Sequence, residues 1–535
     1  MEACRVSYGP MVLRGLERVT RMGDAKTTPW WRSDNALLGG IALAKFILHL
    51  AFVNQYGYFR DEFYYLACGR HLDWGYVDFP PVIGLMGAFV QGVLGDSLLA
   101  VRFFPILAGA GLVFVTGLIA REFGGKRYAQ AMAALCALVA PVLLGNHHFF
   151  GVNVFEQFLW VLAVYVFARI LRAGNLKLWL VFGVVAGIGL MTKLTFLFFG
   201  VSVLLGLLLT SHRKSLLTPW PWLGGLIAFG IFLPHILWQI GHDWPTLKLT
   251  GAYASGKTYD ASLLEAVYMQ ALAIHPLSVP IWLAGMWFLF RDPEGKNYRP
   301  IGWGFAFLAV AFTALSAKFY WLAPAHCAIL AGGACALEQT FRNRGRTWLK
   351  VAYPVALVIG GALTAPMALP VLPPPQAVAF NAFLGGDAGV KHENTRLRGL
   401  PQHFADMFGW QEMVELVAEV YESLPEKDKD GCIVLADNYG NAGAIDLLGK
   451  KYGLPHAICT HNNYHLWGPG EFSDGVVIAV GIEEEELNTL FDQVTLAATF
   501  THPYCMPYEN NKPIYVCRGL RVDLEKAWAE AGHYI

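Results

Sequence analysis

Acidic and aromatic residues are concentrated in one segment, YGYFRDEFYYLACGRHLDWGYVDFPP, which spans residues 56–81. Asp61 and Glu62 are adjacent in it, and Asp73 and Asp78 follow among several tyrosines. A carboxylate held near a reacting hydroxyl group can act as a general base. The alternative is that the acidic residues cap helices and that the Tyr and Trp side chains form the aromatic belt of a membrane interface. The density of ionisable groups favours chemistry over the aromatic belt.

The chain around this segment has the composition of a membrane protein. Of its 535 residues, 55% are hydrophobic and 15% are charged, whereas a soluble protein carries about 25% charged residues. Between residues 35 and 372, apolar runs of 16 to 23 residues follow one another, and a helix needs about 20 residues to cross a bilayer. The forty basic and forty acidic residues balance, which disfavours nucleic-acid binding. We therefore predict a polytopic membrane protein.

Eleven of the apolar runs are predicted to be transmembrane spans. The segment 80–95 is left out, because its sixteen residues begin with two prolines and would reach only about 24 Å as a helix. We place this segment at the membrane interface. The eleven spans lie near residues 35–53, 98–120, 128–145, 151–171, 176–192, 194–210, 221–240, 270–290, 300–316, 319–337 and 350–372.

The distribution of basic residues predicts the orientation of these spans. With eleven spans, Lys and Arg gather in alternate loops, such as 121–127 and 342–350, and basic loops stay in the cytoplasm. This orientation gives a cytoplasmic N-terminal tail, residues 1–34, and a transmembrane domain, residues 35–372. The first loop, residues 54–97, then lies outside the cytoplasm.

Residues 373–535 are predicted to form a separate domain outside the membrane. A Pro-rich hinge, MALPVLPPP, leads into this part of the chain, and its charge content is ordinary. Its apolar pattern predicts the order strand, helix, strand, helix, strand, strand, which is typical of a small α/β domain. An oxidising compartment would permit a disulfide between Cys505 and Cys517; buried thiols are the alternative.

Further polar residues fall on the external side of the predicted spans. Glu156 and Lys193 are flanked by apolar residues, and an ionisable group inside the bilayer costs about 2.5–3.5 kcal/mol on insertion scales. Both residues are therefore candidates for function. The alternative is a mutual structural pair, or side chains that extend to the interface. The other members of this external set are His147, His148, His242, Asp243, Lys318, Tyr320 and His326.

Four of these polar residues could hold a divalent metal ion. Imidazole and carboxylate groups from His147, His148, His242 and Asp78 suit zinc or manganese. Their spacing along the chain matches no recognised ligand pattern, and a histidine at a helix end commonly bonds to backbone instead. A metal ion is therefore a hypothesis that requires the four side chains to meet in space.

The segment RDEFYYLACGRHLDWGYVDFPPVIG resembles the first external loop of GT-C fold glycosyltransferases related to glycosyltransferase family 39. That group includes protein O-mannosyltransferases and the lipid A aminoarabinose transferase. Weaker matches continue to about residue 340, and the C-terminal domain resembles that of bacterial members. The residues that match the loop pattern in order are Asp61, Glu62, Tyr64, Tyr65, Gly75, Tyr76, Asp78, Pro80 and Pro81; the weaker matches contain Arg102, Lys193, His242, Lys318 and Tyr320.

The resemblance implies a fold, an activity and a set of roles. It implies an α-helical membrane protein of the GT-C type in the cytoplasmic (inner) membrane of a bacterium. Such enzymes transfer a sugar, with inversion, from a polyprenyl-phosphate carrier to an extracytoplasmic acceptor in the cell envelope, which is a lipid, a glycan or a protein. Asp61 would be the general base, Glu62 would orient a substrate, and Asp78 would lie near the donor sugar or a metal ion.

The remaining matched residues would contact the substrates. Cations would stabilise the charge that develops on the leaving phosphate; the candidates are Arg60, Arg102, Lys193 and Lys318. The other expected substrate contacts are Tyr64, Tyr65, Tyr76, Glu156, His242 and Tyr320. The chain departs from the pattern at Phe79, where several relatives have lysine, and at Glu156, where relatives often have aspartate.

Two other functions are compatible with the sequence. The first is a transporter or flippase of a lipid-linked or small polar substrate, whose cavity the acidic loop would gate. Transporters place ionisable groups near the bilayer midplane on broken helices, whereas here they gather at one interface. The second is an inactive scaffold whose external domain binds envelope components; in that case Asp61 and Glu62 would be dispensable.

Overall fold

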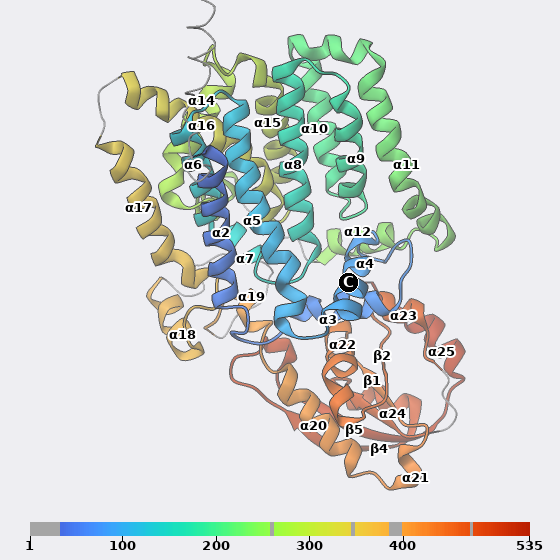
Figure 1. Cartoon of the computed structure of the whole chain (residues 1–535). Helices are drawn as coiled ribbons and strands as arrows, with labels where there is room; N and C mark the ends of the chain where they lie inside the picture. The colour runs from blue at the N-terminus through green and yellow to red at the C-terminus, as the bar shows by residue number, and fades with distance from the viewer. Residues whose placement is uncertain (1–32, 257–261, 344–347, 385–398, 471–474, 535) are drawn as a thin grey trace, which may run out of the picture.

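The computed structural model describes residues 33–256, 262–343, 348–384, 399–470 and 475–534. Its larger part is a bundle of helices, and its C-terminal part is a five-stranded sheet with helices around it (Figure 1). The predicted fold class is confirmed in these main features, because the chain is largely α-helical and ends in a small α/β part. The predicted cytoplasmic tail, residues 1–34, lies almost entirely outside the described residues.

Each of the eleven predicted spans contains at least one helix. Among the described residues, six helices are long and apolar enough to cross a membrane, or up to eight if each of two bent helix pairs is one span. The chain is therefore a multi-pass membrane protein, and the number eleven stays a prediction. The α-helices of this part are α2 (Asp34–Ala51), α5 (Leu98–Glu122), α6 (Arg127–Val139), α7 (Pro141–Asn146), α8 (Val152–Ala173), α9 (Leu178–Leu190), α10 (Phe196–Leu208), α11 (Pro219–Gly241), α12 (Pro245–Gly256), α13 (Leu263–Ala273), α14 (Val279–Phe290), α15 (Arg299–Ala314), α16 (Ala323–Asn343), α17 (Leu349–Thr364) and α18 (Pro374–Phe383).

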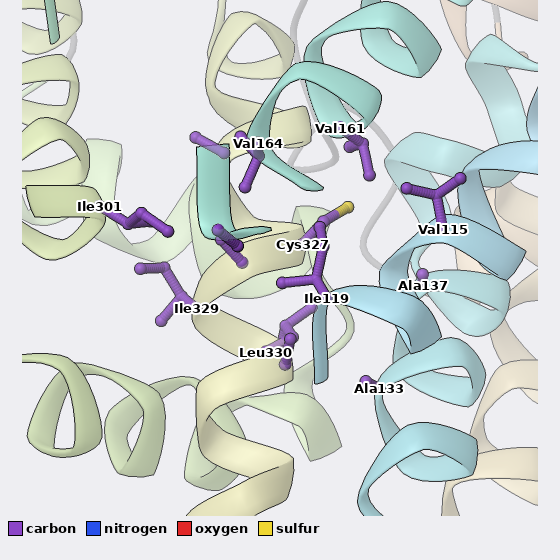
Figure 2. Close-up of a cluster of buried hydrophobic side chains, with 14 of the residues drawn as sticks. Val115, Ile119, Ala133, Ala137, Val161, Val164, Ile301, Cys327, Ile329 and Leu330 are labelled. Carbon is purple, nitrogen blue, oxygen red and sulfur yellow. The ribbon is translucent and has the colours of Figure 1, made fainter. Parts of the chain in front are cut away.

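The core of the bundle is built around α16. This helix packs against α5, α6, α8 and α14, and Figure 2 shows Val115 of α5, Val161 of α8 and Leu330 of α16 within this core. Small residues allow the backbones to come close: at Gly285 of α14, a Cβ atom would lie 1.9 Å from the backbone oxygen of Ile329. Because lipid is as apolar as these side chains, close packing rather than the hydrophobic effect holds such helices together.

A pair of helices, α3 (Arg60–Arg70) and α4 (Val82–Val93), lies between the bundle and the C-terminal sheet (Figure 1). They pack on each other, and α4 occupies the apolar segment 80–95 that is too short to be counted as a span. Eight of the eleven residues of α3 are buried, because the helix also packs against α22 of the C-terminal part. The segment predicted to carry chemistry is therefore an internal layer of the molecule.

The C-terminal sheet has the strand order β2-β1-β3-β5-β4. β1 runs parallel to β2 and β3, whereas β5 is antiparallel to β3 and β4. The predicted elements occur in the predicted order. The sequence did not predict β2, because its two residues are too short to show an alternating pattern. The second predicted helix, EEEELNTLFDQ at 483–493, ends earlier than expected, since β4 begins at Phe491. The elements are α19 (Gln402–Ala405), α20 (Trp410–Glu422), α21 (Glu426–Lys429), β1 (Ile433–Ala436), α22 (Tyr439–Leu448), β2 (Ala457–Ile458), α23 (Asn463–Trp467), β3 (Val477–Val480), α24 (Glu484–Leu490), β4 (Phe491–Phe500), β5 (Lys512–Leu520) and α25 (Leu524–Ala531).

The cysteines of this sheet lie in different apolar clusters. Cys505 packs in the cluster that contains Trp410 and Phe500, and Cys517 packs in the cluster that contains Leu487 and Phe491. No disulfide joins the cysteines that the structure describes. Of the two alternatives, buried thiols are what the structure contains.

We expect Gly285→Ala to destabilise the bundle, because the added Cβ would overlap the backbone of α16. The matched control is Gly230→Ala on α11, where nothing lies within 4 Å of the added atom and where alanine gains about 1 kcal/mol of helix propensity. Thermal unfolding in detergent should show a Tm several degrees lower for the first variant and an unchanged or higher Tm for the control. Equal Tm values would contradict this packing account.

Candidate active site

The first turn of α3 brings two acidic side chains to the layer between the bundle and the sheet. Arg60 begins the helix, and Asp61 and Glu62 follow in its first turn, where the positive end of the helix dipole favours negative charge. The Glu62 carboxylate also accepts a hydrogen bond from the backbone N–H of Phe59, with 2.8 Å between the heavy atoms. The two neighbours then diverge, because Glu62 contacts the bundle whereas Asp61 contacts the C-terminal part.

Glu62 and Arg102 form a buried, two-pronged ion pair. Nε of Arg102 lies 3.0 Å from Oε1 of Glu62, and Nη2 lies 2.9 Å from Oε2. Neither residue has any exposed surface. The backbone N–H groups of Phe59 and Phe150 donate two further bonds to the carboxylate. The guanidinium also donates to the backbone oxygens of Val53 and Gly57. Such satisfaction of every charged group is what a buried ion pair requires.

This ion pair changes the roles expected for both residues. Glu62 was expected to orient a substrate and Arg102 to contact the leaving phosphate. Because both are fully buried and fully bonded, their geometry favours a positioning role, in which they fix α3 against α5 and against the chain around residue 150.

Asp61 is half-buried and faces the C-terminal part. Its Oδ1 atom accepts a hydrogen bond from the Tyr439 hydroxyl at 2.9 Å. The Tyr439 ring stacks on Tyr64, with 4.6 Å between the ring centroids, and the Arg60 guanidinium lies over its other side at 4.7 Å. A tyrosine from another part of the chain thus touches the predicted base.

Asp78 is the second carboxylate of the site. Its Oδ1 atom accepts a hydrogen bond from the Tyr64 hydroxyl at 2.8 Å, and its Oδ2 atom accepts one from the Asn462 amide at 2.9 Å. Burial raises the pKa of Asp78 to about 7, against these two hydrogen bonds, and the charge of Asp61 adds to the rise. Asp78 therefore exchanges its proton near neutral pH.

Tyr65 marks where the predicted groups meet. Burial raises the pKa of its hydroxyl, and the charges of Asp61, Asp78 and Tyr320 raise it further. These groups come from α3, from the loop that follows it and from the segment before α16. The structure therefore gathers Asp61, Asp78 and Tyr320 around one aromatic ring.

Lys193 and Glu156 form the pair that the sequence left open as a structural alternative. Nζ of Lys193 lies 3.6 Å from Oε2 of Glu156, and the Thr195 hydroxyl donates to the same carboxylate. Lys193 also lies 4.9 Å from the ring centroid of Trp321 and 5.8 Å from that of Tyr320. Its side chain remains 16% exposed, so a bound anion can still reach this ammonium group.

The other predicted substrate residues take different positions. Tyr76 is fully buried and donates to the backbone oxygen of Cys68 at 2.9 Å, so it shapes the loop. His242 is exposed at the end of α11 and stacks on Trp238, whose indole donates to Asp73 at 2.7 Å. Lys318 is half-buried directly before Phe319.

The metal site predicted from four residues is wrong as a set. His147 and His148 are buried in the bundle, and the His148 ring lies 5.8 Å from that of His49. His242 and Asp78 have the separate partners given above. Within the described ranges, no three His, Cys, Asp or Glu side chains come together in a way that could hold a metal ion. His147, His148, His242 and Asp78 therefore do not form the metal site that was considered from the sequence.

Sequence reasoning missed several residues that contact the predicted site residues or their neighbours. Tyr439, Asn462 and Asn463 belong to the C-terminal part, and Thr195 and Trp321 flank residues that were chosen. None lies in a recognised motif. The run HNNY at 461–464 is polar enough to suggest a turn, but nothing in it points to Asp78.

Comparisons with known proteins find similarity to glycosyltransferases. A family model described as dolichyl-phosphate-mannose-protein mannosyltransferase matches residues 78–238. The lipid A galacturonosyltransferase RgtD of Rhizobium johnstonii is 22% identical over 241 residues, which cover 45% of this chain and 50% of that protein. The chain thus matches about half the length of this curated relative.

Two solved structures of ArnT from Cupriavidus metallidurans share the architecture. One is in the apo state, with a TM-score of 0.58 and 13% identity. The other is bound to undecaprenyl phosphate, with a TM-score of 0.57 and 14% identity. Each alignment covers 90% of this chain and 97% of the other. The chain has the GT-C glycosyltransferase fold. The resemblance noted in the sequence is therefore confirmed.

Removing one partner of the Glu62–Arg102 pair should strongly destabilise the GT-C fold of this chain. Arg102→Met or Glu62→Met leaves an uncompensated buried charge, which costs about 3–5 kcal/mol. The double variant should recover part of this loss, because no charge is then left alone. Urea unfolding in detergent measures the difference, with the exposed pair Lys248–Asp243 as control; Lys248→Met should cost at most about 1 kcal/mol.

The raised pKa of Asp78 predicts a pH dependence of stability. A carboxyl group whose pKa is higher in the folded state binds more protons there, so its contribution to stability is lost as the pH rises from about 4 to about 7. Asp78→Asn removes this titration. The Tm of Asp78→Asn relative to the unsubstituted protein should therefore be higher at pH 8 than at pH 5. A difference that does not depend on pH would contradict the assignment.

Proposed function

We propose that the chain is a membrane glycosyltransferase that moves a sugar, with inversion, from a polyprenyl-phosphate carrier to an acceptor outside the cytoplasm. The matched family model and RgtD are glycosyltransferases by their names, and the ArnT structure with undecaprenyl phosphate has the same fold. The transferase domain is residues 35–372 in the inner membrane, with residues 54–97 and the domain 373–535 on the extracytoplasmic side. The acceptor is a lipid, a glycan or a protein.

The observation that carries this proposal is the different environment of two adjacent acids. Glu62 is saturated by Arg102 and by backbone donors, whereas Asp61 is half-buried beside Asp78 and Tyr65. A general base must be reachable by its substrate and must lie within hydrogen-bond distance of the proton it takes. Of the two, only Asp61 meets the first condition.

The proposed reaction assigns one role to each of these groups. Asp61 accepts the proton of the acceptor hydroxyl while the oxygen of that hydroxyl forms a bond to the anomeric carbon. On the opposite face, the bond from that carbon to the phosphate oxygen breaks, and its electron pair leaves with the lipid phosphate. A cation beside the phosphate stabilises this charge, and we assign this role to Lys193, a partly exposed ammonium group 5.8 Å from the ring centroid of Tyr320. Attack and departure on opposite faces invert the configuration.

Asp61→Asn should lower the rate of transfer by about 10²–10⁴-fold, the usual contribution of a general base. The measurement is release of free undecaprenyl phosphate from a panel of undecaprenyl-phosphate sugars, by purified protein in liposomes that contain envelope lipids. Asp243→Asn is the matched control, because this carboxylate is 86% exposed and forms a surface ion pair with Lys248 at 2.7 Å. Equal rates for Asp61→Asn and the unsubstituted protein would refute the proposal, and a donor that crosses the bilayer unconsumed would favour the transporter.

A further inference from the structure

We propose that the C-terminal domain is part of the active site, with Tyr439 and Asn462 as positioning residues that hold the carboxylates of Asp61 and Asp78. This inference rests on the proposed function, because it assigns these residues to the same reaction. It goes beyond that function because it gives the sheet domain a direct part in the chemistry.

The C-terminal domain packs against α3 through apolar side chains. Phe63 and Tyr64 of α3 share one buried cluster with Trp410 and Ile445 of the C-terminal domain. Helix α22 comes so close that a Cβ atom at Gly443 would lie 2.8 Å from the Cβ atom of Phe63. Close packing of this kind restricts movement of the domain against α3, and a catalytic site needs its groups held within about 0.5 Å.

Tyr439 is held in place on several sides. It is the first residue of α22, after the helix cap at Asn438, whose side chain accepts from the backbone N–H groups of residues 440 and 441. Tyr64 stacks on its ring and Arg60 lies over the ring as a cation. Its hydroxyl therefore has a fixed direction, and it donates to Oδ1 of Asp61.

The hydrogen bond from Tyr439 favours the ionised form of Asp61. A hydrogen bond donated to a carboxylate favours its charged form. With this bond, Asp61 stays ionised, and able to act as a base, to a lower pH than it would without it. The groups that act on Asp61 from the surrounding elements include Tyr65 of α3, Asp78 of the following loop and Tyr439 of α22. Arg60 lies over the Tyr439 ring. A negative charge on Asp78 has the opposite effect, because it disfavours a second negative charge on Asp61. The hydrogen bond that Asp61 accepts from Tyr439 counteracts this repulsion.

Asn462 reaches Asp78 from a strained loop. It has φ 51° and ψ −128°, a left-handed backbone that few residues other than glycine adopt, and it is fully buried. Strain of this kind persists only where the surrounding structure enforces it, and it gathers at functional sites. Here the strained backbone aims the side-chain amide at Oδ2 of Asp78.

The same loop closes a ring of hydrogen bonds around Asp78. Oδ1 of Asn463 accepts from the backbone N–H of Val77 at 2.7 Å, and the backbone N–H of Asn463 donates to the Tyr64 hydroxyl at 3.3 Å. The segment after α25 then latches the loop, since the N–H of Asn462 donates to the backbone oxygen of His533 at 3.1 Å. The C-terminal domain thus holds both the carboxylate of Asp78, through Asn462, and the backbone of the preceding Val77, through Asn463.

Tyr439→Phe tests the first contact, because phenylalanine keeps the ring but lacks the donor. We expect the acid limb of the pH profile of kcat/KM for lipid-phosphate release to move up by about one pH unit, with a tenfold loss below it and a near-normal rate at high pH. Tyr452→Phe is the matched control, since this hydroxyl donates to the exposed Glu415 in the same domain. An unmoved acid limb in Tyr439→Phe, or an equal shift in the control, would overturn the proposal.

Asn462→Gly tests the second contact while keeping the fold. Glycine adopts the left-handed backbone without strain, which offsets part of the cost of about 1–3 kcal/mol for the lost buried hydrogen bond, so the variant should fold with a moderately lower Tm, whereas the loss of the amide donor to Asp78 should raise KM for the lipid-linked donor at least several-fold. Unchanged KM and kcat in a stably folded Asn462→Gly would refute this role.

The outcome for this proposal is separable from the outcome for the proposed function. If the unsubstituted protein is active and Asp61→Asn is not, unchanged profiles in Tyr439→Phe and Asn462→Gly refute only the role of the C-terminal domain. If no donor is consumed, Tm still decides: the Tm advantage of the unsubstituted protein over Tyr439→Phe should be present at pH 8 and should shrink as the pH falls and Asp61 gains a proton. A Tm difference that does not depend on pH would overturn the contact.

Discussion

The buried ion pair between Glu62 and Arg102 is the constraint on which the rest of the site depends. Two charges without exposed surface are stable only if every donor and acceptor around them is satisfied, and here backbone groups near residues 53, 57, 59 and 150 complete the pair. The position of α3 is therefore fixed from the bundle side. Asp61 directly precedes Glu62 in the first turn of α3. The ion pair that holds Glu62 therefore also restricts the position of Asp61, the proposed base.

The second side of the site is fixed by the C-terminal sheet. The Tyr439 hydroxyl of α22 donates to Asp61, and the Asn462 amide of the strained loop donates to Asp78. Neither half of the chain is sufficient alone, because the bundle supplies Lys193 and the sheet supplies the partners of Asp61 and Asp78. Two adjacent acids thus have different surroundings: Glu62 is fully buried in an ion pair, whereas Asp61, the proposed general base, is half-buried.

Much of the fold could be predicted from the sequence, and less of the site. The length and apolar content of the helices are local properties, so the spans from 98–120 and 221–240 agree closely with α5 and α11. The crowding of ionisable groups in 56–81 also identified the layer that contains Asp61. The contacts within that layer are not local: Arg102 lies 40 residues from Glu62, and Tyr439 lies 378 residues from Asp61, so no spacing rule connects them. The metal set failed for the same reason, because a shared side of the membrane does not bring side chains into contact.

The most direct test of this account is an experimental structure of the protein in a nanodisc with undecaprenyl phosphate. We expect the phosphate group to lie within hydrogen-bond distance of Lys193 and to face the half-buried carboxylate of Asp61 across a space that a sugar can fill. The Glu62–Arg102 pair and the contact from Tyr439 should remain in place. A phosphate bound away from Lys193, or separated from Asp61 by α3 itself, would contradict the central claim that these residues form one transferase site.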